Sequence, residues 1–472
     1  MQEFDLAVIG AGTGGLVSAF LADSLGARVA LIEKNKVGGE CLWTGCVPSK
    51  TLIKSARVYE TVKRASEFGV HLEKPRVIWS AVKLRISDVR DDIKKLEREE
   101  LAKSKIEMIS GAARFEDAST LIVSGKNGEQ KITAKKFILA SGSKARIPEI
   151  EGLSETGFIT HEQIYSLPNL PKSFVFIGGG PIACEFAQAF ARFDCKVTIL
   201  QRGSTLLPRE DEEVSDFVAQ MLRQDGVTIH LNANVQSAKL EGERKSVAFK
   251  IGGETQNVVA SQIVVSAGKE IDLSDLNIEA TEARWSTQGI ETDAYLKAAP
   301  NLWACGDVTG NFLFTHVAEA QGKIAGQNAL LPIKKKWDAR VLPWTTFTDP
   351  EIARVGLTEV EAREIWGEVK VYRQNFSQLD RAIIEGETRG FLKVVTAGSG
   401  RVLGAHIVGP NAGELIHNFV SAVRDGVLIQ EFAETIFVYP TLSEIAHRAG
   451  NGYFQDILKN EWVKSVLKKV VG

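Results

Sequence analysis

The sequence predicts an α/β fold in which two nucleotide-binding units of parallel strands precede a mixed α+β region. Two observations predict this fold. A strand near residue 5 runs into a glycine-rich turn and a helix, and the same arrangement recurs near residue 173. After about residue 338, strands such as 390–395 alternate with helices such as 413–423. A chain of 472 residues is too long for one hydrophobic core, so three or four domains are expected.

The first unit has the features of a Rossmann-like dinucleotide-binding turn. The buried strand 5–9 leads into Gly10, Gly12 and Gly15, which match the pattern G-x-G-x-x-G. The first glycine permits the tight turn, the second lets a pyrophosphate approach the backbone, and the third lets helix and strand pack closely. The helix N-terminus attracts phosphate, and Glu33, at the end of the next strand, can accept hydrogen bonds from a ribose.

A second unit has the same strand, glycine-rich turn and helix. The strand 173–177 leads into Gly178 and Gly180, and Ala183 stands where the third glycine would be. The pattern allows alanine at that position. A helix and a further strand at 196–200 complete the unit. The chain therefore has two dinucleotide sites.

The second unit differs from the first at the residue that would contact the ribose. Gln201 stands where an acid would hold an unphosphorylated ribose, Arg202 follows it, and Arg209 lies nearby. Loss of the acid removes repulsion of a 2′-phosphate, and an arginine can pair with that group. We therefore predict NADPH rather than NADH as the cofactor. The alternative is that both arginines are solvated surface charges.

Between the two units lies a cysteine pair. Cys41 and Cys46 are separated by four residues in the run GGECLWTGCVPSK. Sulfurs at this spacing can close a small disulfide ring that accepts two electrons and passes them on as thiols. On spacing alone, two structural thiols are the alternative. The other cysteines, Cys184, Cys195 and Cys305, are expected to be small buried apolar groups.

The order of these motifs resembles one family, the flavin-dependent pyridine nucleotide–disulfide oxidoreductases, which includes lipoamide dehydrogenase, glutathione reductase and mercuric reductase. The resemblance covers nearly the whole chain. It implies that the first unit binds FAD and the second binds the nicotinamide cofactor. It also implies that Cys46 faces the flavin and Cys41 meets the substrate. Lys50 matches the family lysine beside the flavin, and Glu185 matches its ion-pair partner.

Three further segments resemble the flavin contacts of that family. Residues 140–143, which include Ser141 and Gly142, resemble the crossover between domains. Asp307 resembles the aspartate on the ribityl-phosphate side of the flavin, and Ala318 lies in a segment that resembles the helix start under the pyrimidine ring. Backbone N–H groups at such a helix start favour negative charge.

The chain departs from the family pattern near its C-terminal end. Disulfide-reducing members carry a histidine before Pro-Thr that shuttles a proton to the substrate sulfur across the dimer interface. Tyr439 occupies that place here, whereas Glu444, which would orient the histidine, remains. A phenol with a pKa near 10 is a poor base at neutral pH. His447, which would share a helix face with Glu444, is the alternative base.

The expected activity is that of an FAD-dependent NAD(P)H oxidoreductase that passes electrons through Cys41 and Cys46 to a thiol-reactive acceptor. The missing base favours the mercuric reductase-like branch, because a soft metal ion binds thiolates directly and needs electrons more than protons. The segment 461–469 has no vicinal cysteine pair to hand metal inward, which leaves mercury detoxification itself open. The alternatives are a dihydrolipoamide dehydrogenase-like enzyme, a flavin-only quinone reductase or transhydrogenase, and a silent binding subunit.

Breaks in the pattern predict four segments. They are an FAD-binding domain, a NAD(P)-binding domain, the second part of the FAD-binding domain and a dimerisation domain, over residues 1–149, 150–270, 271–336 and 337–472. The resemblance implies a homodimer.

Bulk composition limits the partners. A net charge of −2 gives no reason to expect nucleic acid or an anionic membrane, and no apolar run is long enough to span one. The first strand leaves no room for a signal peptide, and few cysteines suggest a reducing compartment, so a cytoplasmic enzyme is expected. No resident metal site is predicted. The acceptor is expected to be a small thiol or disulfide, a metal ion or a quinone.

Overall fold

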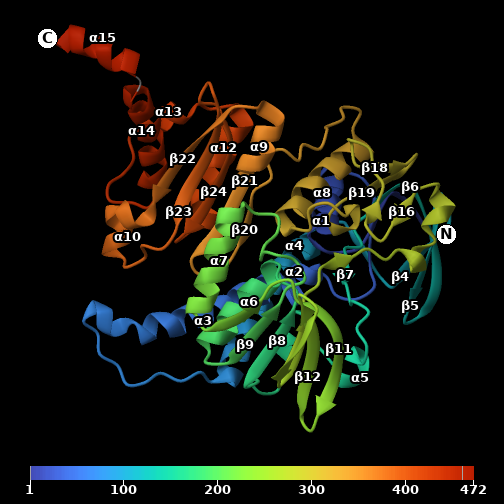
Figure 1. The fold of residues 1–472 in the computed structure, drawn as a ribbon. Helices are drawn as coiled ribbons and strands as arrows, with labels where there is room; N and C mark the ends of the chain where they lie inside the picture. The colour runs from blue at the N-terminus through green and yellow to red at the C-terminus, as the bar shows by residue number, and fades with distance from the viewer. Residues whose placement is uncertain (1, 460, 472) are drawn as a thin grey trace.

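Three large sheets organise the chain, and the computed structural model describes residues 2–459 and 461–471 (Figure 1). The first sheet is built around β1 (Gln2–Ile9), which pairs in parallel with β2 (Val29–Glu33) and β6 (Gly128–Leu139). β1 begins earlier than the sequence predicted because Gln2 pairs with Ile132 of β6. The first residues of β1 are exposed, and pairing with β6 extends the strand without burying them.

The helices beside this sheet carry the cysteine pair. α1 (Thr13–Ser24) packs between the sheet and α8 (Thr315–Leu330). α2 (Gly39–Trp43) and α3 (Cys46–Lys63) follow β2, and α3 packs against α4 (Trp79–Lys103). The two cysteines therefore lie at the junction of α2 and α3.

The second unit is a parallel sheet of four strands in the order β10-β9-β8-β14. These strands are β8 (Ser173–Ile177), β9 (Lys196–Leu200), β10 (Val227–His230) and β14 (Gln262–Val265). α6 (Pro181–Arg192) covers the sheet and also packs against α3. Phe174 and Phe190 stack with ring centroids 4.3 Å apart and are both buried, which fixes α6 on its sheet.

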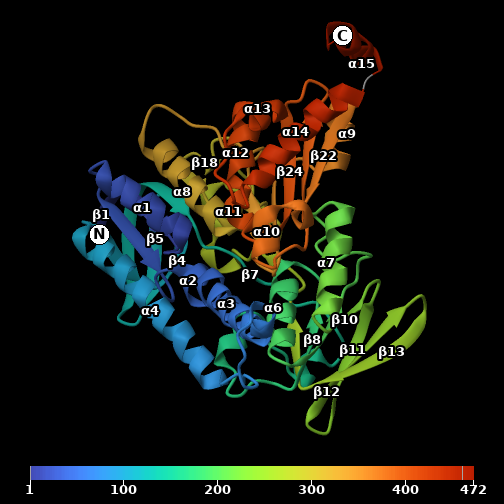
Figure 2. The ribbon, with the colours of Figure 1, turned by 90° about the vertical axis from the view of Figure 1, so that its left-hand side faces the viewer.

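The C-terminal sheet is antiparallel, with the strand order β20-β21-β24-β23-β22. The strands are β20 (Trp344–Thr346), β21 (Glu351–Gly356), β22 (Val369–Asn375), β23 (Phe391–Ala397) and β24 (Val402–Gly409). α12 (His417–Asp425) and α14 (Glu444–Lys459) cover its apolar face (Figure 2). The start of α7 (Glu212–Gln224), from the second unit, meets the opposite face.

The helix predicted over 413–423 is present, with one irregular residue at Ile416. The sequence predicted a single helix over 413–423, whereas the structure has α11 (Ala412–Leu415) and α12, which meet at Ile416. The Ile416 carbonyl accepts bonds from the backbone N–H groups of both Phe419 and Val420, so the hydrogen-bond pattern tightens there. The predicted α/β class with a C-terminal α+β region is confirmed.

The far C-terminal helix, α15 (Glu461–Val471), extends away from the body in Figure 1. Among the described residues, no helix is long and apolar enough to cross a membrane.

Gly15→Ala should destabilise the first unit, because a Cβ at residue 15 would lie 1.8 Å from the Gly10 carbonyl oxygen. Backbone cannot rotate away as a side chain can, so we expect a loss of at least about 1–3 kcal/mol, seen as a lower thermal midpoint. Gly398→Ala is the control, because a Cβ there meets nothing within 4 Å. Equal midpoints for the two variants would contradict the packing argument.

Candidate active site

The cysteine pair lies at the start of α3. Cys46 is the first helical residue and is exposed, whereas Cys41 in α2 is half-buried. Between them the chain turns sharply, because the Gly45 N–H donates to the Glu40 carbonyl at 2.6 Å. No side chain caps the N-terminus of α3, so its free N–H groups favour negative charge at this end.

The two thiols have opposite pKa shifts. The hydrogen bond from Cys41 lowers the pKa of Cys46 to about 6 against the effect of desolvation, with help from Thr315 and the positive charge of Lys50. The Thr315 hydroxyl lies 3.2 Å from the Cys46 sulfur. The same thiol–thiol bond, together with burial, raises the pKa of Cys41 above its usual range. The shared proton therefore stays on Cys41, and Cys46 is the thiolate.

Lys50 and Glu185 form the ion pair expected from the resemblance. The Lys50 Nζ lies 3.0 Å and 3.3 Å from the two carboxylate oxygens of Glu185, whose side chain is 6% exposed. The Phe347 N–H also donates to Glu185 at 2.8 Å, and the Lys50 ammonium lies over the Phe347 ring. This pairing holds a fixed positive charge one helical turn from Cys46.

A second polar cluster adjoins the cysteine loop; of its members sequence reasoning named Asp307 and missed Glu40, His161 and Lys269. The Glu40 carboxylate contacts the His161 Nε2 at 2.8 Å and accepts from the Lys269 Nζ at 2.7 Å. Burial would raise the pKa of Glu40, but His161 and Lys269 together lower it to about 2. Lys269 also pairs with Asp307 at 3.2 Å, and the Ser143 hydroxyl donates to Asp307 at 2.6 Å. No short motif marks His161 or Lys269.

The first glycine turn fits a dinucleotide. α1 begins after Gly12 with no side-chain cap, so its first N–H groups are free for phosphate. A Cβ on Gly39 would lie 2.7 Å from the Gly12 Cα, so the two backbones approach closely. The Glu33 carboxylate, at the end of β2, accepts from the Ala11 N–H at 2.8 Å and from the Asn35 N–H at 2.7 Å. These residues could hold the phosphates and a ribose of FAD.

The other predicted flavin contacts lie around this turn. Gly10 has a φ of +102°, and a Cβ there would lie 2.3 Å from the Ala140 carbonyl oxygen. Ser141 and Gly142 follow directly on the end of β6. Ala318 is buried near the start of α8, and its carbonyl faces Gly14 of α1. The segments around Ala140 and Ala318 therefore both lie against residues 10–14, at the start of α1.

The second turn has the same form. Gly178 has a φ of +118°, and a Cβ there would lie 2.3 Å from the Ser266 carbonyl oxygen. α6 begins after Gly180 with Pro181 in its first position and no side-chain cap. Ala183 is fully buried against the sheet. A nicotinamide dinucleotide could place its pyrophosphate at this helix start.

The segment after β9 presents the residues predicted to select the cofactor. The Gln201 Nε2 donates to the Thr205 carbonyl at 3.0 Å, which closes the loop on itself. Arg202 and Arg209 are exposed. Within residues 2–459 and 461–471, neither guanidinium group has a hydrogen bond or ion pair. Both are therefore available to an anion.

The C-terminal predicted residues form a separate cluster. Tyr439 is exposed, and its hydroxyl donates to the Asp380 carboxylate at 2.8 Å, which raises the pKa of Tyr439. Glu444 pairs with Arg448 at 3.4 Å, and Arg448 also reaches Asp380 at 3.3 Å. Asp380, rather than Glu444, therefore accepts the hydrogen bond of the Tyr439 hydroxyl. His447 contacts a backbone carbonyl through its Nδ1. No hydrogen bond within the described part of the chain joins this cluster to Cys41.

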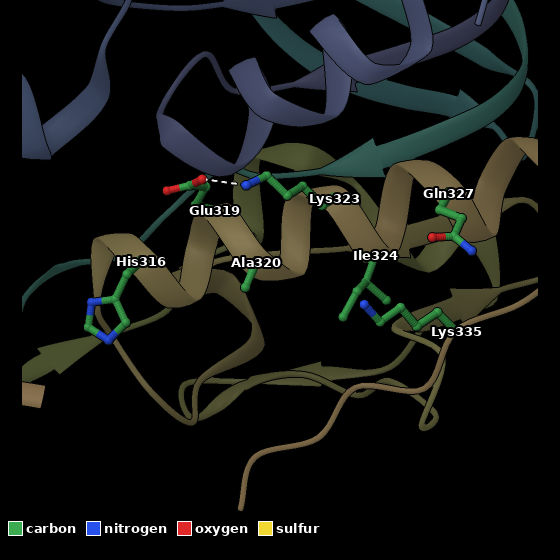
Figure 3. A pocket seen from close by; sticks show the side chains of 7 residues that line it. All are labelled: His316, Glu319, Ala320, Lys323, Ile324, Gln327 and Lys335. Atoms are coloured by element: carbon green, nitrogen blue, oxygen red, sulfur yellow. Dashed lines mark hydrogen bonds and ion pairs between the residues drawn. The ribbon is translucent and has the colours of Figure 1, made fainter. Parts of the chain in front are cut away.

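A hollow of about 290 Å³ lies along the outer face of α8 (Figure 3). It runs from His316, next to Thr315, to Lys335, and Glu319 pairs with Lys323 across one turn of the helix at 2.6 Å. Neither cysteine lines this hollow. We therefore base the chemistry on the cysteine loop.

Two nucleotide-binding turns around a polarised thiol pair define a dinucleotide-dependent dithiol oxidoreductase. Comparison with known proteins makes the assignment specific: the chain belongs to the pyridine nucleotide-disulphide oxidoreductase family, whose profile matches residues 4–322. The dimerisation domain of that family matches residues 342–449. FAD and a pyridine nucleotide are the typical cofactors of the family, and the protein is a flavoprotein disulfide oxidoreductase.

Similar proteins fall into three groups. The chain is 32% identical to a mercuric reductase of Staphylococcus aureus, with 97% of this chain and 84% of the relative covered. It is 35% identical to a dihydrolipoyl dehydrogenase of Corynebacterium glutamicum, with 96% and 98% covered. It also matches the HOCl-induced flavoprotein disulfide reductase RclA from Escherichia coli, solved as a Cu(II) complex, with a TM-score of 0.86 and 29% identity over 96% of this chain and 99% of that one.

Thr315→Val should raise the pKa of Cys46 in the reduced enzyme. The Cys46 thiolate forms as the pH rises through about 6, so its alkylation by iodoacetamide should rise through that pH and then level off. Loss of the hydroxyl donor should move the midpoint upward by about one pH unit. Peptide mapping of the alkylated protein measures this profile.

Thr61→Val, on the exposed side of α3, is the matched control and should leave the profile unchanged. Faster alkylation of Cys41 than of Cys46, or an unmoved midpoint in Thr315→Val, would contradict the assigned polarity.

Proposed function

We propose that this enzyme oxidises NADPH in the cytoplasm and delivers the electrons through Cys41 and Cys46 to a thiol-reactive metal ion, in a mercuric reductase-like manner. The working unit is a homodimer in which the Tyr439 region of each subunit faces the thiols of the other. Bound FAD would supply the electron transfer between NADPH and the thiols, and the first glycine turn, Glu33 and Asp307 would hold it.

The observation that carries this proposal is the hydrogen bond from Tyr439 to Asp380. A base must offer a free electron pair to a proton at neutral pH, but this phenol is a donor to a carboxylate, and its pKa is raised. Glu444, which could orient an imidazole, pairs with Arg448 through one carboxylate oxygen, and its other oxygen has no hydrogen-bond partner among the described residues. The cluster is therefore poorly suited to shuttling protons.

Proton accounting favours a metal ion over a disulfide. Reduction of a disulfide to two thiols consumes two electrons and two protons. Reduction of Hg(II) to the metal, or of two Cu(II) ions to Cu(I), consumes two electrons and no proton. The Cys41 thiol and the Cys46 thiolate would supply the two electrons, form the S–S bond and release the single Cys41 proton to water. No group has to deliver a proton to the acceptor.

The relatives support the same class of acceptor. Mercuric reductases are among the most similar proteins, and RclA, which is a flavoprotein disulfide reductase by name, was solved with Cu(II) bound. Dihydrolipoyl dehydrogenases are equally similar, which makes a disulfide oxidoreductase the second candidate. A flavin-only quinone reductase or transhydrogenase is the third, and it would leave the thiols idle.

NADPH is the proposed electron donor. Gln201 does not repel a 2′-phosphate as an acid would, and the exposed guanidinium groups of Arg202 and Arg209 can pair with one. The uncapped start of α6, just after Gly180, would receive the pyrophosphate.

Serine substitutions test the roles of the thiols. Cys46→Ser should abolish the long-wavelength thiolate–flavin absorption band while the flavin is still reduced rapidly by NADPH. Cys41→Ser should keep that band but stop delivery of electrons to Hg(II) or Cu(II). Cys195→Ser, at a remote buried thiol, is the control. Normal metal reduction by both active-site variants would exclude the thiol relay.

Tyr439 substitutions separate the candidate acceptors. Tyr439→Phe should slow metal reduction if the hydroxyl contacts the metal-bound state, while flavin reduction by NADPH is unchanged. Tyr439→His should raise dihydrolipoamide dehydrogenase activity, at the low end of the roughly 10²–10⁴-fold that general acid–base catalysis provides. The gain is limited because the pocket around residue 439 was not shaped for that substrate.

Steady-state assays with dihydrolipoamide, quinones, Hg(II) and Cu(II) measure these effects. Wild-type turnover of dihydrolipoamide at ordinary enzymatic rates, unchanged in Tyr439→Phe and lost in His447→Ala, would overturn the proposal in favour of a disulfide oxidoreductase with a substitute base.

A further inference from the structure

A row of polar side chains crosses the whole C-terminal sheet. The strand registers place these residues directly opposite one another from β20 to β22, in the order Trp344, Arg354, His406, Lys393 and Arg373. Four of the five are basic, and we call all five, including Trp344, the basic row. The neighbours of the basic row along β21, β23 and β24 belong to the apolar cluster on the opposite face, which α12 and α14 cover. The basic row therefore belongs to the face that meets α7.

The basic row binds the segment that leads into α7 through hydrogen bonds and ion pairs. The Trp344 Nε1 donates to one carboxylate oxygen of Glu210 at 2.6 Å, and the His406 Nε2 lies 3.0 Å from the other. Lys393 pairs with Asp211 at 3.1 Å.

Two arginines of the basic row make the remaining contacts with this segment. The Arg354 guanidinium donates to the backbone carbonyl of Arg209, and Arg373 pairs with Glu213 at 2.6 Å. Every member of the basic row thus contacts residues 209–213.

The central contacts are almost free of water. The side chain of His406 is 0% exposed, and those of Glu210 and Asp211 are each 5% exposed. Burial would raise the pKa of Glu210, yet the hydrogen bond and charge of His406 hold it below its usual value. Both oxygens of the buried Glu210 carboxylate are hydrogen-bonded, so its position is fixed. A different side-chain position would leave its charge unpaired away from water, which is costly.

The segment that the basic row binds also contacts the second glycine turn. The Leu207 N–H donates to the Gly179 carbonyl at 3.0 Å, and Leu207 is buried with a φ of +47°. A leucine adopts this conformation only where its surroundings impose it. Residues 202–211 therefore form a bridge between the dinucleotide turn at one end and the C-terminal sheet at the other.

From this arrangement we propose that the dimerisation domain is a specificity element of the second dinucleotide site. The basic row fixes residues 202–211 so that Arg202 and Arg209 are held ready for the 2′-phosphate of the cofactor. Trp344, His406 and Arg354 are positioning residues, which act through Glu210 and the Arg209 backbone. This inference rests on the proposed use of NADPH.

The physical reason is preorganisation. Two exposed arginines on a free loop would lose conformational entropy on binding an anion, and that loss would reduce the gain from each charge-assisted bond. A loop already fixed at Leu207 and Glu210 has lost this freedom on folding. Loss of contacts between the basic row and this loop should therefore weaken binding of the 2′-phosphate selectively. Binding of the groups that NADPH and NADH share should be unchanged.

The test measures binding of two probes, 2′,5′-ADP and ADP, to the FAD-loaded enzyme by calorimetry. Trp344→Phe removes one N–H donor to Glu210 and keeps an aromatic ring, and His406→Asn weakens the other contact. In each variant we expect 2′,5′-ADP to bind about fivefold or more weakly, with ADP binding unchanged. The matched control is Trp285→Phe, which removes an indole N–H donor to a different glutamate, Glu279, and should change neither affinity.

Arg202→Ala separates the two levels of the argument. If it leaves the affinity for 2′,5′-ADP unchanged, the assignment of NADPH fails, whatever the basic row does. If Arg202→Ala weakens that probe about tenfold while Trp344→Phe and His406→Asn do not, or while they weaken both probes equally, the role of the dimerisation domain is overturned. FAD content and the thermal midpoint report folding of each variant, and Trp344→Phe keeps the test decisive if His406→Asn does not fold.

Discussion

Glu185 is the carboxylate to which all three parts of the chain are tied. It belongs to α6 of the second unit, binds Lys50 of the redox helix, and accepts the Phe347 N–H from the C-terminal region. With 6% of its side chain exposed, it would cost several kcal/mol if left unpaired. The three parts are therefore held together at this carboxylate, which also fixes the position of the Lys50 ammonium, one helical turn from Cys46.

The structure separates two chemical tasks that disulfide-reducing enzymes combine. The polarity of the thiol pair arises locally, from the bond between Cys41 and Cys46, from Thr315 and from Lys50. The Tyr439 cluster, to which we assign proton handling in the proposed mechanism, lies in another part of the chain, where the phenol donates to Asp380. Under the proposed mechanism, loss of the proton shuttle would leave electron delivery intact and would change which acceptors can react.

Sequence reasoning succeeded where the signal is local. The glycine turns and the cysteine loop each fit within a few residues, so their placement on strand, turn and helix followed from spacing. Thr315 could not be found in this way, because it lies 269 residues from Cys46 and is a common helix-start residue. Asp380 lies 59 residues from Tyr439 and meets it only through tertiary packing. The basic row depends on strand register, which no local pattern specifies.

The buried charges of this enzyme are better explained by geometry than by stability. An apolar replacement of a buried ion pair is often neutral or stabilising, whereas removal of one partner is costly. Glu185 and Glu210 both lie in the second unit, and both are held by groups from other parts of the chain. Two such anchors on one unit restrict its rotation as well as its distance from the rest. A hydride donor and a thiol pair that must act in sequence across a bound flavin require that kind of restriction, and apolar contacts alone would permit sliding.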